Sequence, residues 1–181
     1  MVCPCRSCEC VKIYSALKKD LIIRRPTDSD RDAIWEIFHA VVAPGDTYAF
    51  DPKISRDDAM RYWFDPNNRV YVAGQDRHIF GTYILRANQS GGGSHVANAA
   101  FMVASNARGS GVGRAMAEHC LNEARTLGFR AMQFNFVVST NADAIHLWKQ
   151  LAFEIVGTLP GAFKHPTRGY VDVYVMFRPL G

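Results

Sequence analysis

The stretch Arg108-Gly109-Ser110-Gly111-Val112-Gly113-Arg114 indicates how the chain folds around it. It follows an apolar segment, 95–103, that has the composition of a strand, and it opens a segment, 111–127, whose apolar residues recur at helical spacing. Glycines let a backbone approach an anion closely, and the N-terminus of a helix offers unpaired N–H groups with partial positive charge. The turn is therefore predicted to bind a phosphate, with Arg108 and Arg114 adding charge-assisted contacts.

The spacing of the glycines separates three kinds of phosphate-binding turn. The dinucleotide-binding pattern Gly-x-Gly-x-x-Gly is broken, because Arg114 stands where its third glycine belongs. The nucleotide-binding pattern that ends in Gly-Lys-Ser or Gly-Lys-Thr is not formed by this turn either. The turn instead fits Arg/Gln-x-x-Gly-x-Gly, with Arg108, Gly111 and Gly113 at the defined positions.

A second segment, Asn141-Ala142-Asp143-Ala144-Ile145-His146-Leu147-Trp148-Lys149-Gln150-Leu151-Ala152-Phe153, follows the next predicted strand. With the glycine turn it resembles the GNAT superfamily of N-acetyltransferases, and the resemblance extends over roughly residues 21 to 178. In that family the segment has Asn, then Ala three residues later, then Leu-Tyr-x-Lys-x-Gly-Phe. Two departures stand out here: Trp148 replaces the Tyr that often serves as general acid toward the departing thiolate, and Ala152 replaces the Gly.

The resemblance implies a fold, a co-substrate and a mechanism. The expected fold is α/β (α+β), with a mixed, mainly antiparallel central sheet of about six to seven strands and helices on both faces. The co-substrate would be acetyl-CoA, and an amine would attack it directly in a ternary complex without an acyl-enzyme. A bulge around 101–103 would part this strand from strand 131–138, and a backbone N–H near Met102 or Val103 would stabilise the oxyanion. The resemblance assigns catalytic roles to Val103 and Asn141 and cofactor contacts to Phe101, Met102, Val103, Arg108, Gly109, Ser110, Gly111, Val112, Gly113, Arg114, Asn141, Trp148 and Lys149.

The acceptor side is suggested by two asparagines within apolar strands, Asn98 and Asn135. Buried amides cost free energy unless their hydrogen bonds are met, so each either satisfies a strand end or binds a ligand. Together with the loop Gly45-Asp46-Thr47-Tyr48-Ala49-Phe50, they resemble the proline-analogue (azetidine-2-carboxylate) N-acetyltransferases. That resemblance implies that Asn98, Asn135 and Tyr48 bind a small amino-acid substrate, its carboxylate on the two asparagines, in an enzyme of amino-acid detoxification. For the base that deprotonates the amine, the candidates are Glu36, His39, Asp46 and Tyr174.

Length, composition and charge limit the number of domains, the partners and the location that we expect. The chain of 181 residues is long enough for a single domain, and its formal net charge of +4 is too small to indicate nucleic-acid binding. No apolar stretch is long enough to cross a bilayer, so we expect a cytoplasmic protein without a membrane partner. We expect the acetyltransferase domain in residues 21–181, after a flexible, Cys-rich tail in residues 1–20. The GNAT resemblance is compatible with a homodimer.

The pattern along the chain predicts its elements. Helices are expected up to about 42, and near 55–64, 111–127 and 141–151, and strands near 21–23, 70–73, 80–85, 95–103, 131–138, 153–159 and 170–178.

Three other functions remain open at this point. A non-catalytic acetyl-CoA-binding regulatory module would share the same turn, and the change at Trp148 favours it. A protein N-acetyltransferase would need an open peptide groove. A metal-binding protein would use the cluster Cys3, Cys5, Cys8 and Cys10, although usual zinc sites split their ligands into two distant pairs, and we assign no metal.

Overall fold

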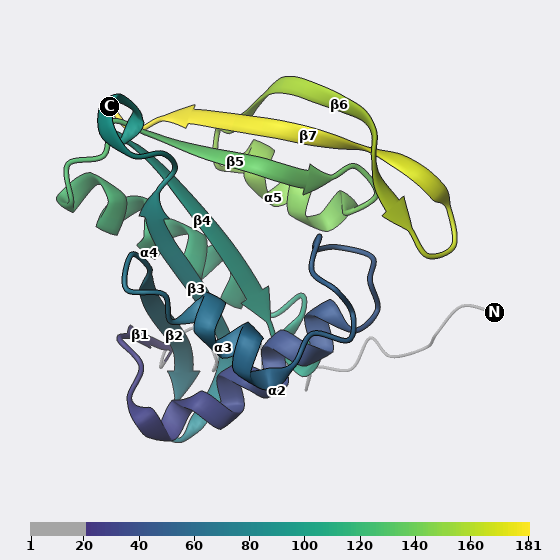
Figure 1. Cartoon of the computed structure of the whole chain (residues 1–181). Coiled ribbons are helices and arrows are strands. Elements are labelled where there is room, and N and C mark those ends of the chain that lie inside the picture. The colour runs from purple at the N-terminus through teal and green to yellow at the C-terminus, as the bar shows by residue number, and fades with distance from the viewer. Residues whose placement is uncertain (1–20) are drawn as a thin grey trace, which may run out of the picture.

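A computed structural model describes residues 21–181, and the predicted cysteine cluster at residues 3–10 lies outside them. Seven strands form one sheet in the order β1-β2-β3-β4-β5-β7-β6 (Figure 1). All neighbours are antiparallel except β4 and β5, which are parallel, so the predicted mixed and mainly antiparallel sheet is confirmed. In chain order the elements are β1 (Ile22–Arg24), α2 (Arg31–Val42), α3 (Arg56–Trp63), β2 (Arg69–Gln75), β3 (His78–Ala87), β4 (Val96–Val103), α4 (Val112–Thr126), β5 (Ala131–Val138), α5 (Ala142–Gln150), β6 (Glu154–His165) and β7 (Gly169–Pro179).

Helices cover the sheet on both faces (Figure 1). Alternate residues of a strand point to opposite faces, and β4 shows this plainly. Its residues Ala97 and Ala99 belong to the core under α4 and α5, whereas Met102 belongs to the core under α2 and α3. In the stretch 21–181, no helix has the length and apolar character that spanning a bilayer requires. Within the same stretch, no three His, Cys, Asp or Glu side chains are grouped as metal ligands would be.

The parallel neighbours β4 and β5 part soon after they meet, as Figure 1 shows. They share two register pairs, Val96 with Ala131 and Ala97 with Met132. We call the divergence beyond these pairs the strand split. The bulge expected at 101–103 is wrong, because the pairing of β4 with β3 keeps one register from Ala97 to Val103. The irregularity lies in β5 instead, where the register with β7 shifts between Phe134 and Val137, and such a bulge bends the strand that carries it.

The last hairpin is longer than the sequence predicts. The sequence predicts a strand over 153–159, and Pro160 and Gly161 follow it. In the structure β6 continues to His165, and its register with β7 shifts between Leu159 and Phe163. β6 is an edge strand, where proline is tolerated because one side of the strand needs no N–H donor. The positive φ of Gly161 (59°) accommodates the irregularity.

Thr82 ties the α3 layer to the sheet. Its side chain is fully buried, its hydroxyl donates to the Tyr71 carbonyl oxygen at 2.8 Å, and it accepts from the Trp63 indole N–H at 3.1 Å. Trp63 is also fully buried, with its ring edge-on to Phe38 of α2. One hydroxyl therefore satisfies the indole N–H that would otherwise be unpaired in this core.

We expect Thr82→Val to lower the free energy of unfolding by about 1–3 kcal/mol, because valine keeps the shape but leaves the Trp63 indole N–H without an acceptor. Urea denaturation followed by tryptophan fluorescence measures this change. Thr82→Ser is the control, since it keeps the hydroxyl and loses a methyl group. Equal stability of the valine variant and the natural chain would contradict this role for the hydroxyl.

Candidate active site

In the glycine turn the Ser110 N–H donates to the Ala107 carbonyl oxygen at 3.3 Å, while the N–H groups of Gly109 and Gly111 have no backbone partner within residues 21–181. Gly109 and Gly111 have φ values of 75° and 84°, in the left-handed region that favours glycine. The Ser110 hydroxyl donates to the Ala107 carbonyl oxygen at 2.6 Å and closes the turn. Helix α4 then begins at Val112, and the Ala115 N–H donates to the Gly111 carbonyl oxygen. The N–H groups at the start of α4 precede this bond and have no acceptor within the helix, which makes them an anion-binding site.

This turn lies against the end of β4 and against α5. A Cβ added to Gly113 would be 3.6 Å from Val103 Cγ2 and 3.8 Å from Leu147 Cδ2. Val103 is the last residue of β4, so the anion-binding N–H groups stand beside the open end of the strand split. The two sequence segments that resemble the acetyltransferases therefore meet in space.

The two arginines of the turn differ in their surroundings. Arg108 is exposed. The Arg114 guanidinium contacts the Gln150 side chain and lies 3.6 Å from the Glu118 carboxylate, an ion pair within α4. Both arginines add positive charge next to the N-terminus of α4, where the helix dipole favours anions.

The edge of β4 that faces β5 is partly capped by a tyrosine. The Tyr48 hydroxyl donates to the Phe101 carbonyl oxygen at 2.6 Å and accepts from the Phe101 N–H at 3.1 Å. Burial raises the pKa of Tyr48, so the hydroxyl stays protonated and keeps its donor role. Successive residues of a strand direct their backbone groups to alternate edges, so Val103 faces the strand split as Phe101 does, and Met102 faces β3.

A side chain replaces the next ladder bond beyond the last pair of β4 and β5. The Asn98 amide donates to the Gln133 carbonyl oxygen at 2.8 Å, directly after the Ala97–Met132 pair. Asn135 is exposed on β5; its amide accepts from Gln133 Nε2 at 2.8 Å and donates to Asn88 Oδ1 at 2.6 Å. The sequence singled out Asn98 and Asn135 but missed Gln133 and Asn88, although the two-residue spacing of Gln133 and Asn135 places both on one face of β5.

Asn141 stands at the start of α5, just past the end of β5. Its Oδ1 accepts from the Ala144 N–H at 3.3 Å, which is the capping interaction expected of asparagine at this position. The carboxyl ends of parallel strands lie at the same edge, so Asn141 follows β5 at the same open end as Val103 on β4. The amide N–H groups of Asn141 are not used by the cap.

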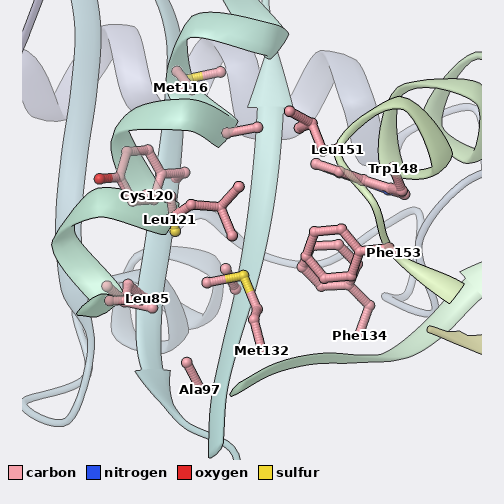
Figure 2. Close-up of a cluster of buried hydrophobic side chains, with 14 of the residues drawn as sticks. Leu85, Ala97, Met116, Cys120, Leu121, Met132, Phe134, Trp148, Leu151 and Phe153 are labelled. Carbon is pink, nitrogen blue, oxygen red and sulfur yellow. The ribbon is translucent and has the colours of Figure 1, made fainter. Parts of the chain in front are cut away.

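Trp148 is part of the core, not of an open surface. Figure 2 shows it beside Phe134 and Phe153 under α5. Its side chain is 8% exposed, and its ring centroid is 4.6 Å from that of Phe134 and 5.1 Å from that of Phe101. An indole in this setting packs the floor of the split and supplies no ionisable proton. Lys149, the next residue, is exposed.

The side chains considered as nucleophile or base lie on different elements of the fold. Cys120 of α4 is fully buried, and burial raises the pKa of its thiol, so this thiol is not an accessible nucleophile. Glu36 and His39 are exposed on α2, and Tyr174 of β7 packs against the core under α4 and α5. Asp46 lies in the same loop as Tyr48 and accepts from the Thr47 hydroxyl at 3.3 Å.

The comparisons with known proteins agree with this arrangement. Residues 31–153 match the model of the acetyltransferase (GNAT) family. N-acetyltransferase aca1 of Schizosaccharomyces pombe is 30% identical over 148 residues, which cover 72% of this chain and 71% of that protein. A GCN5-related N-acetyltransferase from Kribbella flavida is 44% identical with a TM-score of 0.86, covering 90% of this chain and 99% of that one.

A more distant structure shares the fold. It is a GNAT superfamily phosphinothricin acetyltransferase (Pat) from Sinorhizobium meliloti in complex with AcCoA, 22% identical with a TM-score of 0.78, covering 89% of each chain. The family match includes the turn at the start of α4, the strand split and α5, and the chain belongs to the acetyltransferase (GNAT) family.

Proposed function

We propose that this acetyltransferase transfers the acetyl group of acetyl-CoA to the amine of a small amino acid or a cyclic analogue of one. The observation that carries the proposal is the glycine turn with unpaired N–H groups beside the unpaired end of β4. The relative from Sinorhizobium meliloti is a phosphinothricin acetyltransferase solved in complex with AcCoA. It supports acetyl-CoA as the donor and a small amino acid as the acceptor.

The diphosphate of CoA would bind the N–H groups of residue 109 and residues 111–114, since the Ser110 N–H donates to Ala107, and Arg108 and Arg114 would add charge. The pantetheine arm would then run along the free edge of β4 like an added strand. Val103 is the residue whose backbone groups face the strand split next to the turn, so its N–H is the donor we assign to the thioester oxygen. Met102 is the weaker candidate, because its backbone groups face β3.

The reaction needs no acyl-enzyme. The amine nitrogen attacks the thioester carbon, an N–C bond forms, the C–S bond breaks, the amine loses a proton and the thiolate gains one. Among residues 21–181 the one cysteine is Cys120, and its buried thiol is not accessible as an acyl-accepting nucleophile, which is compatible with direct attack. Holding both reactants in line across the split would supply much of the rate. The free amide N–H groups of Asn141 suit a contact to the arm or to a bridging water.

The acceptor would bind on the opposite side of the split from α4 and α5. Asn98 and Asn135 each use one amide N–H in the contacts described above, and each NH₂ group carries a second donor. Two neutral amides can therefore hold a carboxylate, and Tyr48 binds the same β4 edge at Phe101, three residues along the strand from Asn98. The proline-analogue subtype remains a prediction from the sequence.

A thiol-release screen with acetyl-CoA and a panel of amino acids, including proline analogues and phosphinothricin, tests the proposed function. We expect release with small amino acids and not with lysine-containing peptides. Release with peptides alone would indicate a protein N-acetyltransferase. Binding of acetyl-CoA by calorimetry without release from any amine would indicate a regulatory module.

We expect Gly111→Asp to weaken CoA binding by at least about 10-fold, measured by calorimetry. The substitution strains a left-handed position and places a carboxylate beside the diphosphate. Gly128→Asp is a matched control, because Gly128 follows the other end of α4 with a φ of 82° and therefore suffers the same strain. Equal affinity of a folded Gly111→Asp variant and the natural chain would refute the phosphate site.

We expect Asn135→Ala to raise KM for the small amino-acid substrate by about 10-fold, because one hydrogen bond to its carboxylate is lost. KM for acetyl-CoA should stay unchanged, since Asn135 lies on the acceptor side. Asn122→Ala, at an exposed position of α4, is the control. A natural KM for the amino acid in the Asn135 variant would rule out the carboxylate role.

A further inference from the structure

Tyr48 lies on the edge of β4 that faces the strand split, at Phe101. Its hydroxyl makes both hydrogen bonds that the Phe101 backbone offers to the split. Edge-facing residues of a strand are two positions apart, so Phe101 is about 6.6 Å along the edge from Val103. Asn98 closes the split further along through its bond to the Gln133 carbonyl oxygen. The free length of the β4 edge is therefore short, and Tyr48 stands at its inner end.

The ring of Tyr48 has little freedom to withdraw. It stacks on Phe50, with ring centroids 5.9 Å apart and an interplanar angle of 28°. Phe50 in turn packs 5.2 Å from Phe38 and 4.9 Å from Tyr62, between α2 and α3. The loop that carries Tyr48 is thus held by an aromatic row on one side and by the backbone of Phe101 on the other.

We propose that Tyr48 is the wall that limits the acyl group of the thioester to about two carbons. This inference rests on the proposed function, because it takes acyl-CoA to enter from the turn at residues 109–114, with its thioester at Val103 and its acyl group pointing along the edge toward Phe101. An acetyl group ends before the ring. Each further methylene would have to displace a ring that is fixed by two hydrogen bonds and by Phe50.

The test compares acetyl-CoA, propionyl-CoA and butyryl-CoA with one amine, by thiol release. In the natural chain we expect kcat/KM to fall at least about 10-fold from acetyl to butyryl, because butyryl adds two methylenes and even one is usually discriminated by about this factor. Tyr48→Ala should raise the butyryl-to-acetyl ratio at least about 10-fold, because the wall is removed. Tyr48→Phe should leave this ratio within about 3-fold of the natural one, because the ring remains held by Phe50.

Binding measurements keep the test independent of turnover. Calorimetry with butyryl-CoA should show tighter binding by Tyr48→Leu than by the natural chain, while the affinity for CoA itself stays the same. The proposed role of Tyr48 would be refuted if the butyryl-to-acetyl ratio of kcat/KM stays unchanged in Tyr48→Ala. It would also be refuted if this ratio rises equally in Tyr48→Phe. If the natural chain binds no acyl-CoA at all, the proposed function fails. If it transfers acetyl normally but the ratio is unchanged in Tyr48→Ala, only the proposed role of Tyr48 as a wall fails.

Discussion

Two parallel strands that separate after two pairs leave backbone N–H and carbonyl groups facing each other with no ladder between them. Such groups need partners, because an unpaired polar group in a protein interior costs free energy. The chain supplies some of these partners itself: the Asn98 amide for Gln133 and the Tyr48 hydroxyl for Phe101. Those left over, at Val103 and at the start of α4, lie close together because Gly113 stands beside Val103, and the proposed chemistry depends on them.

The split stays open because the floor beneath it is packed with aromatic rings. Trp148, Phe134 and Phe101 meet there with centroid separations of 4.6 to 6.2 Å. Large buried rings hold strands at a fixed spacing, since closing the split would force them out of a close-packed arrangement. Trp148 therefore contributes packing at this position, where a tyrosine would supply an ionisable proton.

The sequence predicts those parts of the site whose requirement is local. Gly111 and Gly113 were identified because a phosphate turn demands glycine at particular spacings, and Asn141 because it matches the second family segment, at a helix start that also favours asparagine. The Asn98–Gln133 bond could not be derived, because it joins residues 35 positions apart across strands whose pairing ends there. The length of β6 was missed for a similar reason. Pro160 is compatible with a strand only at the edge of a sheet, and the local sequence does not reveal the order of the strands.

The Asn98 amide closes the split with a side chain, whereas a ladder bond would close it with backbone. A backbone rung is fixed by the strand register, but an amide can be moved by substitution. Moving it two positions toward Val103, to the side of Tyr48, would close a further stretch of about 6.6 Å of the split, whereas in the other direction Val96 and Ala97 are already paired with β5. The same scaffold can thus accommodate acyl carriers of different reach through changes at single positions, and the depth of the reaction chamber becomes a quantity that evolution or a protein engineer can adjust.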